Sequence, residues 1–212
     1  MINIIDIHTH RLDAPQALIS VDPRQFVPRD GLYYSVGYHP WHDVDRLTEE
    51  DFDLLEQCAR HPQVLAIGET GMDQLRGAPL HIQGQVFVRH LLLAREVGKP
   101  VVAHCVRASQ DILTTRHHAG LDDVTLVIHG MRSNERIART LLQAGCHLSF
   151  GTHFHPAALL ATPPDRLLIE TDDGPATIDD VACLVADTMG KTREEVMTLA
   201  RHNSSRLLTI IH

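Results

Sequence analysis

Five short apolar runs, spread along the chain as far as residue 172, each lead into side chains that commonly bind metal ions. The runs are rich in Val, Ile, Leu and Ala, and they end at His8 and His10, Glu69, His104, His129 and Asp172. Continuous apolar runs of this length are typical of parallel strands that are buried on both faces. The pattern therefore predicts an α/β fold in which helices connect parallel strands.

The ends of these predicted strands indicate chemistry. His8 and His10 are two residues apart, so both imidazoles point to the same face of an extended strand. A single His at a strand end is more often a surface or core residue than a ligand, but a His-rich surface gives no reason for five strands to end alike. Active sites of α/β barrels lie at the carboxyl ends of the strands. The set of four His, one Glu and one Asp therefore predicts a site for two divalent ions.

The rest of the sequence predicts further strands and the helices between them. Thr48 and Asp51 have the spacing of a helix cap, and Gly98 can end a helix before the strand that begins at Pro100. Further strands are predicted at residues 17–21, 32–38 and 146–151, and helices at residues 48–60, 82–97, 109–118, 133–144, 178–189 and 192–208. Eight parallel strands with helices between them predict a TIM-type (β/α)8 barrel.

The length of the chain requires a trimmed barrel. A TIM barrel typically needs about 250 residues, and this chain has 212. The segment from His10 to Ala17 leaves no room for a helix, and the segment from Val21 to Leu32 leaves room for a turn or two. Helices after strands 1 and 2 are therefore expected to be missing or very short, with loops, the C-terminal helix or another subunit covering those strands. A monomer and a homo-dimer both fit, and residues 1–212 are expected to form one domain.

Composition narrows the classes of function. The formal net charge of −8 gives no basic footprint for nucleic acid, which counts against a general DNA-binding role. The four cysteines show no C-x-x-C spacing, and the chain begins without a cationic, cleavable leader. No apolar stretch approaches the roughly 20 residues that cross a bilayer. A cytoplasmic location without membrane contact is expected.

Several motifs occur in the order and spacing of a known family. They are Asp6-Ile7-His8-Thr9-His10, Gly37-Tyr38-His39-Pro40, Ile67-Gly68-Glu69-Thr70-Gly71-Met72-Asp73, Pro100-Val101-Val102-Ala103-His104-Cys105, Val127-Ile128-His129-Gly130 and Leu168-Ile169-Glu170-Thr171-Asp172. With these motifs the chain resembles the TatD family of metal-dependent hydrolases, within the amidohydrolase superfamily. The resemblance implies magnesium- or manganese-assisted deoxyribonuclease activity.

The resemblance also implies a role for each ligand. His8, His10 and Asp172 would hold one metal ion, His104 and His129 the other, and Glu69 would bridge the two. Asp172, at the mouth of the site, is suited to orient a water molecule and take its proton, so Asp172 and Glu69 are the predicted catalytic residues. Two loops depart from the family pattern, at Gly130-Met131-Arg132-Ser133 and Asp172-Asp173-Gly174-Pro175. The family's substrate therefore follows less directly than its hydrolytic chemistry.

Polar residues just beyond the strand ends could contact substrate. They are His39, Arg107, Arg132, His153 and His155. Each could bind a phosphate or another anionic group, although exposed loop positions account for them equally well. Asp73 could be a partner for a metal-bound His or could cap a turn.

Three functions remain open on the sequence. The first is a phosphodiester hydrolase that acts on DNA ends or small phosphodiesters, with two divalent ions that could be zinc, manganese or magnesium. The second is a hydrolase of a small ester, amide or lactone, which needs the same metal site. A non-catalytic metal-binding protein is the third, and it would have no need of Asp172 as a base.

Overall fold

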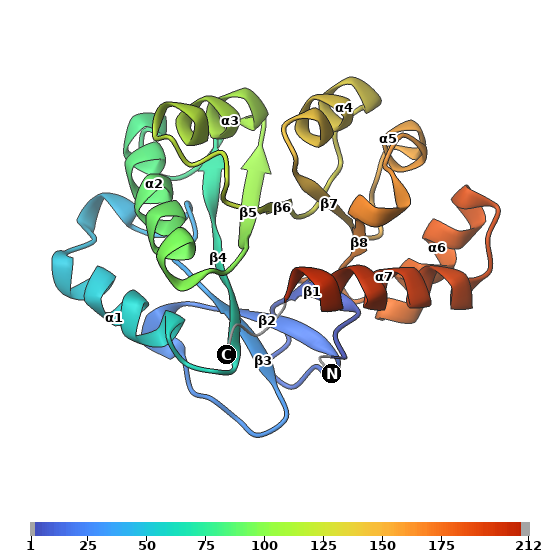
Figure 1. The fold of residues 1–212 in the computed structure, drawn as a ribbon, viewed down its shortest axis with the longest axis horizontal. Coiled ribbons are helices and arrows are strands. Elements are labelled where there is room, and N and C mark those ends of the chain that lie inside the picture. The colour runs from blue at the N-terminus through green and yellow to red at the C-terminus, as the bar shows by residue number, and fades with distance from the viewer. Residues whose placement is uncertain (1–2, 209–212) are drawn as a thin grey trace.

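The computed structural model describes residues 3–208, in which eight parallel strands close into a barrel (Figure 1). Each strand pairs with its neighbours in sequence, and β1 pairs with β8 to close the sheet. The strands are β1 Asp6–Thr9, β2 Ala17–Val21, β3 Tyr33–Val36, β4 Val64–Asp73, β5 Val101–Val106, β6 Leu126–Ile128, β7 His147–Phe150 and β8 Leu167–Ile169. The predicted TIM-type barrel is confirmed.

Each strand from β3 onward is followed by at least one α-helix on the outside of the barrel. They are α1 Glu49–Ala59, α2 Leu80–Val97, α3 Ser109–His118, α4 Glu135–Gln143, α5 Pro156–Leu160, α6 Ile178–Met189 and α7 Arg193–Leu207. Thr48 and Asp51 form the predicted capping box of α1, and Gly98 ends α2 in the left-handed conformation. Helix α5 was not predicted, because five residues are too few to show a helical period.

The barrel is trimmed where the sequence predicts it. No helix separates β1 from β2, and only the short 3-10 helix η1, Pro23–Gln25, lies between β2 and β3. The following segment packs Phe26 against Tyr34, with ring centroids 5.3 Å apart. Helix α7 lies beside the start of the chain in Figure 1, and Arg201 Nε donates to Asn3 Oδ1 at 3.0 Å. A loop and the C-terminal helix thus lie against this side of the barrel.

A small apolar cluster fills the interior of the barrel beneath the strand ends. Its buried members are Ile4, Ile7, Leu18, Leu65, Ala66, Val102, Val127, Leu168 and Leu208. Several of them precede a predicted ligand by an even number of residues, as Val102 precedes His104 and Val127 precedes His129. Because side chains alternate along a strand, the ligands point inward above this apolar floor.

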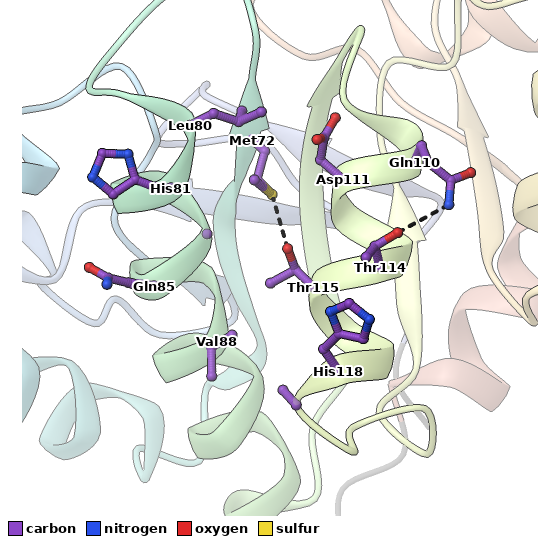
Figure 2. Close-up of a pocket in the computed structure, with 12 residues that line it drawn as sticks. Met72, Leu80, His81, Gln85, Val88, Gln110, Asp111, Thr114, Thr115 and His118 are labelled. Carbon is purple, nitrogen blue, oxygen red and sulfur yellow. Dashed lines mark hydrogen bonds between the residues drawn. The ribbon is translucent and has the colours of Figure 1, made fainter.

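Outside the barrel, α2 and α3 border a groove of about 640 Å³ (Figure 2). Its lining includes Met72, whose sulfur accepts a 3.9 Å hydrogen bond from Thr115 Oγ1. No residue that lines this groove belongs to the predicted ligand set. Among residues 3–208, no helix combines the length and the apolar character that crossing a bilayer requires.

Candidate metal centre

The six predicted ligands meet at the carboxyl ends of the strands, around Glu69. Its Oε2 atom lies 3.3 Å from His8 Nε2 and 3.2 Å from His10 Nε2. Oδ1 of Asp172 lies 3.6 and 3.7 Å from the same two nitrogens. His8, His10 and Asp172 thus offer three ligand atoms within 4.8 Å of one another.

The second oxygen of Glu69 faces a different pair of imidazoles. Its Oε1 atom lies 2.9 Å from His104 Nδ1 and 2.8 Å from His129 Nε2. One carboxylate therefore separates two sets of nitrogens, and each of its oxygens faces one set. A bridging carboxylate between two cations requires this arrangement.

Buried carboxylates hold two of the imidazoles that face Oε1. Asp73 Oδ2 lies 3.2 Å from His104 Nε2, and Glu170 Oε1 lies 3.3 Å from His129 Nδ1. A carboxylate that accepts a hydrogen bond from one ring nitrogen keeps the proton on that nitrogen. The other ring nitrogen is then unprotonated and can bind a metal. Asp73 also accepts from the backbone N–H of Leu75 at 2.7 Å, so it partners a His and caps a turn.

Asp172 is placed by the closing of the barrel. Its backbone N–H donates to His8 O at 3.0 Å, and its own carbonyl accepts from His10 N–H at 3.2 Å. Its φ of 53° lies in the left-handed region, which is uncommon for a residue other than Gly. These hydrogen bonds on both sides hold a backbone conformation that costs energy, as is frequent at functional sites.

The buried polar atoms of the cluster fit a cation. His8 is 0% exposed, and neither of its ring nitrogens has a hydrogen-bond partner among the described residues. Burial alone raises the pKa of Glu69, but His129 and His8 hold it well below its ordinary value. Burial and His129 lower the pKa of His8, yet Glu69 and Asp172 together raise it to about 9. The carboxylates thus attract positive charge, and an unprotonated imidazole nitrogen can donate its lone pair to a metal ion.

The residues predicted to contact substrate lie at different distances from the cluster. His39 Nε2 lies inside the cluster, 2.8 Å from Glu69 Oε1. Arg132 Nη2 reaches to 3.9 Å from Asp172 Oδ2. Arg107, His153 and His155 are exposed, and within residues 3–208 no hydrogen bond or ion pair joins them to the cluster.

A cleft of about 480 Å³ opens onto the cluster over the ends of β2 and β3. It is lined by His10, Leu12, Ser20, Val21, Asp22, Gln25, Gly37, His39, Trp41, His42, Glu69 and Asp173. Sequence reasoning missed Trp41 in this wall and Glu170 behind His129. Glu170 could have been found, because it is two residues before Asp172. Nothing in the sequence showed that Trp41 would remain exposed.

The barrel and the His, Glu and Asp side chains clustered at its carboxyl end are those of a metal-dependent hydrolase. The model of the family described as TatD related DNase matches residues 25–209. The chain belongs to the TatD family, and it is a hydrolase that acts on ester bonds.

Individual relatives agree with this assignment. The uncharacterized metal-dependent hydrolase YabD of Bacillus subtilis is 31% identical over 202 residues, covering 85% of this chain and 79% of that protein. The 3'-5' ssDNA/RNA exonuclease TatD of Cronobacter sakazakii is 33% identical over 155 residues, covering 68% of this chain and 57% of its own. The crystal structure of YJJV, a TatD homolog from Escherichia coli K12, superposes with a TM-score of 0.85 over 99% of both chains at 18% identity, which supports the fold.

Proposed function

We propose that this protein hydrolyses phosphodiester bonds at single-stranded DNA ends or in small phosphodiesters, with two divalent ions bound at the cluster. The observation that carries the proposal is that the two carboxylate oxygens of Glu69 face different pairs of imidazoles. Oε2 faces His8 and His10, and Oε1 faces His104 and His129. The first ion would be held by His8, His10, Asp172 and Glu69, and the second by His104, His129 and Glu69.

The donor atoms indicate which metals to test first. Imidazole nitrogens suit zinc and other transition metals, whereas magnesium prefers oxygen ligands. Each proposed site contains two imidazoles, so zinc or manganese is the proposed occupant ahead of magnesium. When bound, a pair of such ions supplies Lewis-acid activation of water and of the phosphoryl group.

Asp172 is the proposed base. Its side chain is 24% exposed, so a water molecule from the solvent can reach it. Burial raises its pKa, but His8 beside it lowers the pKa below that of an ordinary Asp. Asp172 is therefore ionised at neutral pH, which is the form that accepts a proton from water.

Two residues at the mouth are proposed to bind the phosphate. Burial lowers the pKa of His39, so its imidazole is neutral at pH 7 and carries a single ring N–H. Its Nδ1 accepts from the Trp41 backbone N–H at 3.1 Å, so that proton is on Nε2, 2.8 Å from Glu69 Oε1. This N–H would be released to a phosphoryl oxygen if Glu69 were bound to metal. Arg132, near Asp172 and with a side chain 62% exposed, can supply positive charge to the same group. Arg107, His153 and His155 lie farther out on the rim, where they could contact more distant parts of a substrate.

Charge favours a short single-stranded substrate. The net charge of −8 and the acidic side chains of Asp22 and Asp173 in the cleft wall oppose binding of a long polyanion. The name of the relative from Cronobacter sakazakii specifies single-stranded DNA and RNA, which supports a phosphodiester substrate over an ester, amide or lactone.

A substrate panel tests the proposal. Protein loaded with zinc or manganese is assayed on single-stranded oligonucleotides, duplexes, bis-nitrophenyl phosphate, nitrophenyl esters and lactones, with the Asp172→Asn variant as a control for contaminating nucleases. We expect metal-dependent cleavage of single-stranded ends in preference to long duplex. Turnover confined to esters or lactones would overturn the phosphodiester assignment and leave the hydrolase intact. Duplex binding with a salt dependence that implies six or more phosphate contacts would contradict the short-substrate proposal.

We also propose a cytoplasmic location and a single-domain organisation for the enzyme. Cys58, Cys105, Cys146 and Cys183 are all free thiols, as is usual in a reducing cytoplasm. Residues 1–212 would act as one hydrolase barrel domain, as a monomer or a homo-dimer.

A further inference from the structure

Trp41 is the only tryptophan of the chain, and it lies in the wall of the cleft. It is 41% exposed, although large aromatic side chains are usually buried. Its ring centroid is 4.8 Å from that of His39 and 5.2 Å from that of His104. An exposed indole therefore stands directly beside the candidate metal centre.

The orientation of this indole is fixed from behind. Trp41 Nε1 donates to Asp73 Oδ2 at 2.6 Å, and the same oxygen lies 3.2 Å from His104 Nε2. The rings of His39 and His104 both meet the indole at steep angles of 77°. The hydrogen bond to Asp73 and the contacts with the His39 and His104 rings already fix the position of the indole. The ring therefore loses little conformational entropy when a ligand binds to its exposed part.

A cation covers part of the same ring. The guanidinium carbon of Arg76 lies 4.1 Å from the Trp41 ring centroid. The loop that carries Arg76 is tied down by Gln83, a buried side chain whose Nε2 donates to the carbonyls of Asp73, Arg76 and Ala78.

Gly77 also holds this loop close to the loop that bears Trp41. Its φ is +89°, and a Cβ atom there would lie 2.1 Å from the carbonyl oxygen of Pro40. Only glycine permits this close approach, so Trp41 and Arg76 are brought together by the backbone as well as by their side chains.

We propose that Trp41, backed by Arg76, is a stacking platform for the nucleobase next to the scissile phosphate. The inference rests on the proposed phosphodiesterase function and adds the part of the substrate that is recognised. Every base offers a π-face, and stacking on an aromatic side chain is a general means of binding single strands. Arg76 adds positive charge beside a cleft whose wall otherwise carries Asp22 and Asp173.

The platform also explains a preference for single strands. In a duplex, both faces of each base are covered by its neighbours, so an internal base is not free to stack on Trp41. A frayed or single-stranded end presents such a base without the cost of unstacking. The polar cleft residues Ser20, Gln25 and His42 are available to the edge of the stacked base.

The test compares two substrates that differ only in their bases. Wild type, Trp41→Leu and Trp41→Phe are assayed on a single-stranded oligonucleotide and on the same oligonucleotide with abasic residues at its terminal positions. Trp41→Leu should raise KM for the complete oligonucleotide by about 10-fold, with little change for the abasic one. Trp41→Phe, which keeps a ring but loses the hydrogen bond to Asp73, should retain most of the base-dependent binding. Leu92→Ala, an exposed change on α2, serves as the matched control.

The outcomes separate stacking from a structural role. Equal losses on both substrates would show that Trp41 acts only through Asp73 or the fold, and no loss on either would show that it does not bind substrate. Both results overturn the platform.

If wild type cleaves no oligonucleotide at all, the proposed function is refuted. A binding measurement still tests the stacking platform in that case. The fluorescence of Trp41, free of any other tryptophan signal, is then followed in the Asp172→Asn protein. Quenching by the complete but not by the abasic oligonucleotide supports the platform, and equal or absent quenching contradicts it.

Discussion

The backbones of His8 and Asp172 are hydrogen-bonded to each other where the barrel closes, with Asp172 N 3.0 Å from His8 O. Their side chains meet as well, with 3.6 Å between His8 Nε2 and Asp172 Oδ1. The contact that completes the fold therefore also sets the distance between a proposed metal ligand and the proposed base.

Replacing Asp172 by Asn should nearly abolish turnover. The amide has the same shape but cannot accept the proton of the attacking water, and it removes one negative charge from the first proposed metal site. We expect the turnover number to fall on the order of 10²-fold or more. Steady-state assays check this, with circular dichroism as the control for folding. Activity within a few-fold of wild type would mean that another group activates the water.

The carboxylates behind the second pair of imidazoles should control metal affinity. Asp73→Asn and Glu170→Gln remove the negative partners of His104 and His129, so the tautomers that present bare nitrogens are no longer favoured. Affinity for the second proposed ion, at His104 and His129, should fall about 10- to 100-fold in each variant. Isothermal titration with zinc measures it, and Asp53→Asn, an exposed change on α1, should have no effect. Unchanged affinity in both variants would refute the proposed role of these carboxylates.

Acid should destabilise the protein through His90. This imidazole is 0% exposed, accepts from Tyr38 N–H at 3.0 Å, and bonds through Nδ1 to Val86 O at 2.8 Å. Burial lowers its pKa to about 4. The unfolded state, with a His pKa near 6.5, binds the proton first, so the contribution to the free energy of unfolding is intact above about pH 6.5 and is lost as the pH falls toward 4.

Urea unfolding at pH 7 and pH 4.5 measures this contribution. About 2–3 kcal/mol should be lost from wild type through this group over that interval. His90→Gln, which does not titrate, should be less stable at pH 7 but should lose that much less on acidification. The same decrease in both proteins would assign the acid sensitivity elsewhere, for example to His147, whose pKa burial also lowers to about 4.

Much of this architecture follows from local sequence patterns. The apolar runs predicted the barrel because strands that are buried on both faces leave a compositional signal. The clustering of the six candidate ligands could be predicted because strand ends converge in such a barrel. The caps at Thr48 and Gly98 are local hydrogen-bond and backbone effects, which a sequence displays directly.

Other features depend on contacts between distant residues. His39 was predicted as a substrate contact, and its approach to Glu69 depends on how β3 and β4 pack, which no local pattern displays. Arg107, His153 and His155 lie on rim loops whose path is set by tertiary packing. The exposure of Trp41 depends likewise on the β4–α2 loop that supports it.

The central claim, that Glu69 bridges two divalent ions, is tested most directly by counting bound metal. Wild type, Glu69→Gln and the exposed control Glu50→Gln are dialysed against zinc or manganese, and metal per chain is measured by elemental analysis. We predict about two ions per chain in wild type and in Glu50→Gln, and at most one in Glu69→Gln. A wild-type protein that binds no ion, or a Glu69→Gln protein that still binds two, would contradict the claim.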